Sequence, residues 1–321
     1  MKKFMMQALT LFCILCMTGC GSTNKEQTKA IDGRENDFAD EYRNYGGEFL
    51  VLGLVNDTEP TESGVVYLNS ITDNLNVQFA NLTDNDSEYI LKLFLDYKEI
   101  EFNINGELTD QYIFQAKAGE SLVFPINLSS AVELNSSHFL TIAVLTAPNK
   151  HAKTIERMSN SYGMVLSYEL APKNGSRTIE TEITFDEASE YLELNYQGLV
   201  LNSDFDTSGN TMVRFPDKEY VVKAGDTVKL AYRAGNYENV EDILIVVLVD
   251  WRQQSINGAD YLHIRNSPGY ISFGTLEFTA PLEAGEYEVT AFVAEQPFNL
   301  KNFDSFHTHD TAYRFTLTVQ K

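Results

Sequence analysis

The stretch YRFTLTVQ at residues 313–320 alternates strictly between large apolar and polar side chains. Its odd-numbered residues are Tyr, Phe, Leu and Val, and its even-numbered residues are Arg, Thr, Thr and Gln. Side chains of a β-strand point alternately to its two faces. The pattern therefore predicts a strand with one buried face and one solvated face.

The same two-residue period recurs along the chain, at residues 75–79, 122–128 and 228–232. Helical periodicity is confined to two short stretches, residues 151–159 and 186–191, and neither is long enough to organise a core. Clusters of Asn, Asp, Gly, Pro and Ser separate the alternating runs and predict turns. We therefore expect an all-β protein.

An internal echo suggests two copies of one module. KAGESL at residues 117–122 is matched by KAGDTV at residues 223–228, and each Ala-Gly pair predicts a tight turn before a strand. Strongly apolar runs follow at residues 139–145 and 243–249. Pro, Lys, Asn, Gly and Ser cluster at residues 172–176, where we place the boundary between the copies.

The string GEYEVTAFV at residues 285–293 resembles the late strand of immunoglobulin-like domains, in which a tyrosine, here Tyr287, pins a corner. The resemblance is limited to such short strings and implies an architecture without naming a family. We expect two consecutive immunoglobulin-like β-sandwich domains, at residues 45–173 and 174–321.

The N-terminus carries a targeting pattern. Lys2 and Lys3 precede an apolar segment that is shorter than the roughly 20 residues of a membrane-spanning helix. The segment ends in Met-Thr-Gly-Cys, residues 17–20, which resembles the lipobox of bacterial lipoproteins. The resemblance implies that residues 1–19 are a signal peptide that is removed and that Cys20 carries a thioether-linked diacylglycerol. The alternative is an ordinary secretory signal followed by a chance cysteine.

Residues 20–44 are polar and charged and are expected to form a flexible tether behind the lipidated Cys20. The expected location is the outer face of the cell membrane, or the outer membrane if the host is Gram-negative. Cys13 and Cys16 lie in the segment to be removed, so the mature chain is expected to have no disulfide.

The charge balance excludes some classes of partner. The chain has 46 acidic and 24 basic residues, for a formal net charge of −22. Nucleic acids and anionic lipid surfaces attract basic proteins, so neither is an expected partner. An acidic chain favours cation binding but does not require it.

A possible calcium loop lies at residues 204–210, DFDTSGN. Asp204, Asp206, Ser208 and Asn210 place oxygen atoms at the spacing of the first half of an EF-type loop. The second half fails, because position twelve is Phe215 where a glutamate is expected. A calcium-binding β-loop and a plain polar hairpin turn both remain open, and Ca²⁺ is the cofactor that the loop suggests.

A possible zinc site involves His307 and His309, which at a spacing of two residues share one face of a strand. Asp304 and Asp310 are close in sequence, and His263 could approach through the fold. A zinc site needs at least three protein ligands, so a solvated connection remains the alternative.

Trp251 is the only tryptophan of the chain. It could be a stacking platform for a sugar or a peptide, with Tyr261 and His263 nearby, or the buried tryptophan that is common in sandwich cores. We favour the buried position.

Sequence motifs of hydrolases, metalloproteases, P-loop proteins and dinucleotide-binding enzymes are missing from the chain. The acidic pairs Glu99/Glu101 and Glu180/Glu182 could serve glycoside hydrolysis, but among 46 acids such pairs arise by chance, and we interpret them as a solvated sheet face. We expect a non-enzymatic lipoprotein that binds or scaffolds a protein or a surface polymer. The alternatives are a metal- or small-ligand-binding accessory of a transport or secretion system, and a hydrolase with a dispersed site.

Overall fold

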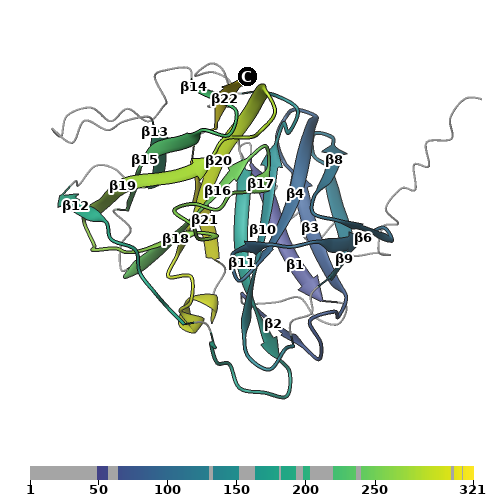
Figure 1. Cartoon of the computed structure of the whole chain (residues 1–321). Coiled ribbons are helices and arrows are strands. Elements are labelled where there is room, and N and C mark those ends of the chain that lie inside the picture. Colours follow the sequence, from purple (N-terminus) through teal and green to yellow (C-terminus); the bar gives the residue numbers. More distant parts are fainter. Residues whose placement is uncertain are drawn as a thin grey trace, which may run out of the picture.

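The fold is nearly all β-sheet (Figure 1). The computed structural model describes residues 49–56, 64–129, 133–151, 163–180, 182–192, 198–202, 220–235, 240–304, 307–312 and 314–321. In these residues the one helix is the short 3₁₀ helix η1 (Leu300–Asp304), and every other regular element is a strand. Among them there is also no helix that is long and apolar enough to cross a membrane. The all-β prediction is confirmed.

The first half of the chain forms a sandwich of two sheets. The outer sheet has the order β1-β3-β9-β6-β7. Its strands are β1 (Leu50–Asn56), β3 (Leu75–Asn81), β9 (Ser121–Leu128), β6 (Phe102–Ile104) and β7 (Glu107–Thr109). The inner sheet is built on β4 (Ser87–Leu95), β10 (His138–Thr146) and β11 (Gly163–Pro172), with the short strands β2 (Val65–Leu68), β5 (Lys98–Glu99) and β8 (Tyr112–Ala116) at its edges.

The second half repeats this plan. Its outer sheet has the order β12-β19-β15-β13. These strands are β12 (Ser189–Leu192), β19 (Tyr270–Thr279), β15 (Thr227–Gly235) and β13 (Gly198–Asn202). The inner sheet contains β14 (Tyr220–Lys223), β16 (Asp242–Val249), β17 (Arg252–Gln253), β18 (Leu262–Arg265), β20 (Gly285–Glu295), β21 (His307–Thr311) and β22 (Phe315–Gln320).

The strand pairing is that of immunoglobulin-like sandwiches. In the second sandwich β20 pairs antiparallel with β16 and β22, and β15 pairs antiparallel with β13 and β19. In the first, β10 lies between β4 and β11 in the same way. The last strands β11 and β22 each take a short parallel partner, β2 and β14. The predicted all-β, immunoglobulin-like fold class is confirmed, whereas the count of two domains and their boundaries stay a prediction.

The two inner sheets are joined into one. Strand β21 pairs with β20 of the second sandwich and also with β11 of the first, where Val165 lies opposite His309. A 13-stranded sheet results, and its two halves face each other across the seam between the sandwiches. The sheets therefore stack as outer, inner, inner and outer (Figure 1).

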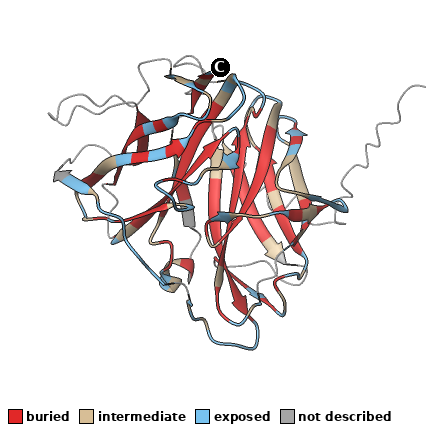
Figure 2. Ribbon diagram, viewed as in Figure 1, coloured by how far each residue is buried: buried red, intermediate tan, exposed pale blue. Residues whose placement is uncertain are grey.

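Three apolar cores fill the spaces between the four layers. One lies inside each sandwich, and the third, which we call the middle core, lies between the inner sheets. Strand β16 shows the division, because Ile243, Ile245 and Val247 belong to the core of the second sandwich while Leu244 and Val246 belong to the middle core. The inner strands are therefore buried along most of their length (Figure 2).

The prediction that one face of the C-terminal strand is solvated is wrong. Phe315, Leu317 and Val319 are buried as predicted, but Arg314 and Thr316 on the other face are only 3% and 8% exposed. The reason is the first sandwich, which covers this face of the inner sheet. Strict alternation identified the strand, but it could not show that a second layer lies on the polar side.

The Lys-Ala-Gly echo does not mark equivalent strands. Both turns exist, with Gly119 and Gly225 at positive φ of 73° and 75°. However, the turns precede β9 and β15, and the strand of the first sandwich that corresponds to β15 is β3, which lies between β1 and β9. The prediction of two similar modules agrees with the two sandwiches, but the strings that suggested it are out of register.

The resemblance at residues 285–293 is confirmed. Near the start of β20 the hydroxyl of Tyr287 donates a 2.9 Å hydrogen bond to the carbonyl of Glu283, four residues upstream. This contact is the tyrosine corner of immunoglobulin-like domains.

Truncating a large side chain of the middle core should destabilise both sandwiches together. Phe292 is 2% exposed and meets Phe94 of the other sandwich edge to face, at 5.3 Å between ring centroids. We expect Phe292→Ala to lower the free energy of unfolding by about 3–5 kcal/mol. Urea denaturation followed by circular dichroism measures it. The control is Leu282→Ala, because Leu282 is 82% exposed. A loss below about 1 kcal/mol for Phe292→Ala would contradict the shared core.

Candidate functional site

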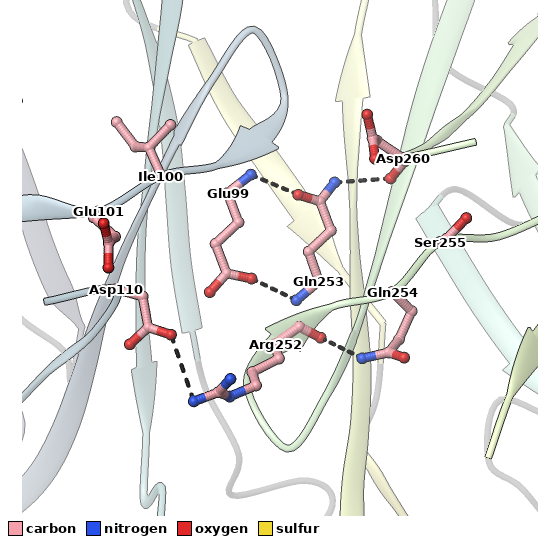
Figure 3. A pocket seen from close by; sticks show the side chains of 9 residues that line it. All are labelled: Glu99, Ile100, Glu101, Asp110, Arg252, Gln253, Gln254, Ser255 and Asp260. Atoms are coloured by element: carbon pink, nitrogen blue, oxygen red, sulfur yellow. Dashed lines mark hydrogen bonds and ion pairs between the residues drawn. The ribbon is translucent and has the colours of Figure 1, made fainter. Parts of the chain in front are cut away.

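One concave site lies between the sandwiches, and another lies between the second sandwich and the stretch that leads into it. The first, which we call the notch, is an open hollow of about 390 Å³ between the hairpins β4–β5 and β16–β17 (Figure 3). Its lining is Glu99, Ile100, Glu101, Asp110, Arg252, Gln253, Gln254, Ser255 and Asp260.

The floor of the notch is a reciprocal pair of hydrogen bonds between the sandwiches. The backbone N–H of Gln253 donates to Oε2 of Glu99, and the backbone N–H of Glu99 donates to Oε1 of Gln253, both at 2.6 Å (Figure 3). The amide group of Gln253 also donates to the carbonyls of Tyr97 and Asp260. Each short strand thus has its edge closed by a side chain of the other sandwich.

A buried lysine neutralises the glutamate of this floor. The side chain of Lys92 is fully buried, and its ammonium group forms an ion pair with Oε1 of Glu99. The interpretation of Glu99 and Glu101 as a solvated sheet face is therefore wrong for Glu99, whose side chain is only 17% exposed. The second acidic pair, Glu180 and Glu182, is exposed and lies outside the strands. It belongs to the stretch between β11 and β12, which we call the connector.

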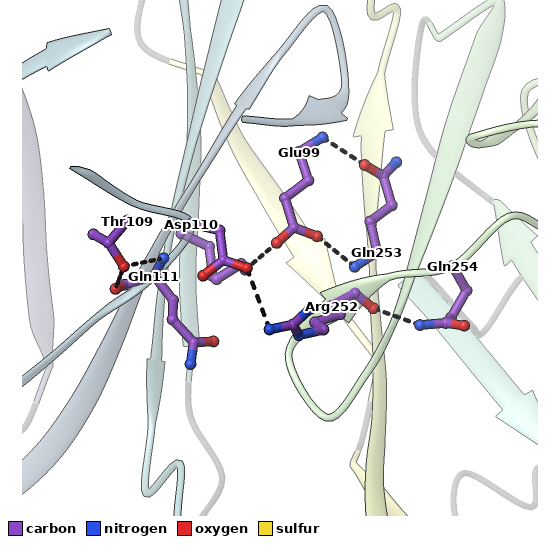
Figure 4. Close-up of polar contacts among 8 residues, drawn as sticks. Glu99, Thr109, Asp110, Gln111, Arg252, Gln253 and Gln254 are labelled. Atoms are coloured by element: carbon purple, nitrogen blue, oxygen red, sulfur yellow. Dashed lines mark hydrogen bonds and ion pairs between the residues drawn. The ribbon is translucent and has the colours of Figure 1, made fainter. Parts of the chain in front are cut away.

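Exposed ion pairs bridge the rim of the notch. Lys98 contacts Asp260 at 2.9 Å, and Arg252 contacts Asp110 at 3.7 Å (Figure 4). The hydrogen bond with Asp260 raises the pKa of Lys98. Such solvated pairs contribute at most about 1 kcal/mol each. The charges of the notch are thus largely matched within the protein, and they join the sandwiches.

The second site, which we call the groove, is more apolar and has a volume of about 490 Å³. It lies between the connector that leads into the second sandwich and the loop from β20 to η1. Its apolar lining is Ile179, Ile183, Phe185, Phe298 and Leu300. Its polar lining is Glu241, Asp242, Arg265, Gln296, Asn299 and Lys301.

A histidine–aspartate pair supports one wall of the groove. The side chain of His263 is 3% exposed, and its Nε2 lies 2.5 Å from Oδ2 of Asp242. The backbone N–H of His263 donates to the carboxylate of Asp186, and its carbonyl accepts from the N–H of the same residue. These bonds fasten the connector to the edge of β18.

Two ring contacts orient the connector side of the groove. The ring centroids of Phe185 and His263 are 4.6 Å apart. The guanidinium of Arg265 lies over the ring of Phe185, at 4.4 Å from its centroid. Phe185 and Ile183 nevertheless remain 38% and 44% exposed. The groove therefore presents apolar surface at fixed positions beside charges of both signs, which suits the binding of a partner side chain.

Trp251 is a buried structural residue, not a surface platform. It is 5% exposed in the middle core, and its Nε1 donates a 3.1 Å hydrogen bond to the carbonyl of Pro148 in the other sandwich. The guanidinium of Arg314 covers the ring at 4.6 Å and pairs with Glu288 at 3.0 Å. The buried position that we favoured is correct, although the core in question lies between the sandwiches.

His309 of the predicted zinc site is not brought together with His263. Nε2 of His309 lies 2.6 Å from the hydroxyl of Ser167 in β11, whereas His263 pairs with Asp242. No group of three or more metal-ligating side chains occurs within the described part of the chain. The side chain of His307 lies outside that part, so the zinc site stays a prediction.

Other predicted residues also lie outside the described residues: Cys20 and the tether, and Asp204, Asp206, Ser208 and Asn210 of the possible calcium loop. Sequence reasoning missed the groove, because its lining comes from four segments that are distant in the chain. The exposed Ile183 and Phe185, in a polar connector, were the available signal.

Comparisons with known proteins identify no family. No family model matches the chain, and no curated protein matches it. Among solved structures, the E. coli chaperone DraB is 10% identical with a TM-score of 0.28, covering 84% of this chain and 97% of the chaperone. The structure of the Salmonella enterica SafA pilin in complex with the SafB chaperone gives 9% identity and a TM-score of 0.26, covering 85% of this chain and 98% of the matched chain.

A red sea bream transglutaminase matches at 11% identity and a TM-score of 0.22, covering 88% of this chain. The chain spans about a third of that enzyme, 33% of its length. At these identities and TM-scores the likenesses carry no functional argument.

Removing both charges of the Lys92–Glu99 pair should be tolerated better than removing one. Glu99→Gln leaves the buried ammonium of Lys92 without its counter-charge, and we expect a loss of about 3–5 kcal/mol in the free energy of unfolding. Adding Lys92→Met should restore most of this loss, because an apolar side chain needs no partner. Chemical denaturation of the two variants measures the difference. A double variant that is less stable than Glu99→Gln would contradict this role.

Proposed function

We propose that the chain is a membrane-anchored extracytoplasmic lipoprotein whose paired sandwiches form a non-enzymatic binding module for a protein or a surface polymer. The observation that carries the proposal is the groove, which combines exposed Ile183 and Phe185 with a rim of both charges. Binding sites of this kind bury apolar side chains of a partner and orient it through a few polar groups.

The anchor rests on the lipobox resemblance at residues 17–20. Two acyl chains on Cys20 would hold the protein at a membrane stably, since each buried CH₂ contributes about 0.8 kcal/mol and one chain alone is marginal. The acidic surface directs this protein toward partners other than nucleic acid. The fixed wall made by His263, Asp242 and Asp186 supports binding without a large rearrangement of the site.

The anchor is tested by replacing the cysteine. We expect Cys20→Ser to abolish incorporation of a clickable palmitate analogue and to shift the protein from the membrane pellet to the soluble extracytoplasmic fraction. Cys13→Ser is the matched control, because Cys13 lies in the predicted signal peptide. Continued labelling of the Cys20→Ser protein would show that the anchor is not at this residue.

The binding site is tested by photo-cross-linking in cells. A benzoylphenylalanine at position 183 should give a discrete adduct, and the same group at position 108 should not. Leu108, which is 53% exposed on the short edge strand β7, is the control for exposure alone. The adduct should weaken at least fivefold when Phe185→Asp is added. Digestion by proteases or by wall-degrading enzymes identifies the adduct as a protein or a polymer. Equal adducts at positions 183 and 108 would contradict a site in the groove.

A further inference from the structure

The two sandwiches contain one hairpin in two copies. Strand β4 ends in Leu95 and is followed by Asp96-Tyr97, and β16 ends in Val249 and is followed by Asp250-Trp251. Asp and aromatic residue both have positive φ, 50° and 63° in the first copy and 49° and 68° in the second. Two successive left-handed residues form the tight turn that suits a hairpin.

The surroundings of the turns are also equivalent. The N–H of Asp96 donates to the carbonyl of Phe139 in β10 at 2.8 Å, and the N–H of Asp250 donates to the carbonyl of Glu288 in β20 at 2.7 Å. Strands β4 and β16 therefore correspond, as do β10 and β20.

A second turn repeats at the other end of these strands. Ala147 follows β10 and Gln296 follows β20, with positive φ of 52° and 44°. The N–H of Ala147 donates to the carbonyl of Glu88, the second residue of β4, at 2.7 Å. The N–H of Gln296 donates to the carbonyl of Asp242, the first residue of β16, at 2.8 Å. Each of these turns continues into a proline.

The equivalent residues contact each other crosswise. The hydroxyl of Tyr97 in the first sandwich donates to the carbonyl of Pro297 in the second at 2.8 Å. Nε1 of Trp251 in the second sandwich donates to the carbonyl of Pro148 in the first at 3.1 Å. Each turn aromatic thus binds the proline turn of the opposite sandwich.

The contacts in the notch also join equivalent residues of the two sandwiches crosswise. Glu99 and Gln253 occupy the same position of the two hairpins, and each bonds the other's backbone N–H at 2.6 Å. On the rim, Lys98 and Arg252 are equivalent, and each pairs with an aspartate of the opposite sandwich. Strand β11, the last strand of the first half, also pairs antiparallel with β21, the strand before β22, and an antiparallel pairing between the halves agrees with a two-fold axis.

We propose that the surface between the sandwiches is a pseudo-two-fold association surface, on which each sandwich binds the other as a copy of itself. In an isologous interface residue i contacts residue j and residue j contacts residue i, as these pairs do. The partner that this surface fits is an immunoglobulin-like sandwich with an Asp-aromatic hairpin. The surface, and not the covalent connector after β11, holds the two halves together. This inference is independent of the proposed function.

One departure from symmetry shows how the pair is specialised. Lys92 lies opposite Ala143 in the first sandwich, and Val246 lies opposite Phe292 in the second. Lys92 of β4 corresponds to Val246 of β16, and Ala143 of β10 corresponds to Phe292 of β20. The larger residue of each opposed pair is therefore on β4 in the first sandwich and on β20 in the second. The ion pair of Lys92 with Glu99 exists on one side of the pseudo-axis alone, because the equivalent pair is Val246 and Gln253. The two-fold relation is therefore approximate at this position.

Cleavage of the full chain between the sandwiches tests the proposal. A protease recognition sequence is inserted between Asn174 and Gly175, which are exposed in the turn after β11. After cutting, we expect the two fragments to co-elute in gel filtration at micromolar concentration and to separate in denaturant. Separation of the fragments in native buffer would overturn the proposal.

A matched pair of variants tests the symmetry. Tyr97→Phe removes one of the two crossed hydrogen bonds and should weaken fragment association by about tenfold. Trp251→Phe removes the other bond together with part of the buried ring that Arg314 covers, so its effect should be at least as large. Tyr270→Phe is the control, because Tyr270 is 40% exposed on the outer sheet. In the uncut chain both variants should lower the denaturation midpoint. An effect confined to one of them would overturn the two-fold equivalence.

Discussion

Burial of the inner sheets on both faces is the constraint on which the rest of the structure depends. A sheet with one solvated face tolerates polar residues at every second position. Strand β16 has no such freedom, because Ile243, Ile245 and Val247 fill one core while Leu244 and Val246 fill another. This requirement explains the unbroken apolar run at residues 243–249, and it makes the two sandwiches one packed body.

Several polar groups at this seam have partners from another layer or strand. Glu169 of β11 is fully buried and accepts hydrogen bonds from Ser137 and from the guanidinium of Arg177. The same guanidinium donates to the carbonyl of Leu300 at 2.8 Å, so it connects the first sandwich with η1 of the second. Nearby, the hydroxyl of Ser167 lies 2.6 Å from both Thr141 and His309. A buried polar group without such a partner costs about 1–3 kcal/mol, so these bonds restrict the docking of the sheets to one arrangement.

Much of the fold could be predicted from local patterns, because strand formation and turn chemistry are local. The alternation at residues 315–319 and the tyrosine corner at Tyr287 both follow from neighbouring residues. The middle core could not be predicted, since a wet face and a face covered by another sheet can share the same alternating pattern, as Thr316 shows. The correct repeat is also weak in sequence. Its shared features are an aspartate, an aromatic residue and a backbone conformation, which the longer but misleading Lys-Ala-Gly strings obscured.

The groove is connected to the seam at one end, which relates the architecture to the proposed function. Its walls come from the connector, from β16 and β18, and from the loop before η1, and Arg177 fastens the last of these to the first sandwich. A change that loosens the seam would therefore move Leu300 and Phe298 away from Phe185 without touching any groove residue. Under the proposed function, binding in the groove and the association of the two halves are therefore physically coupled.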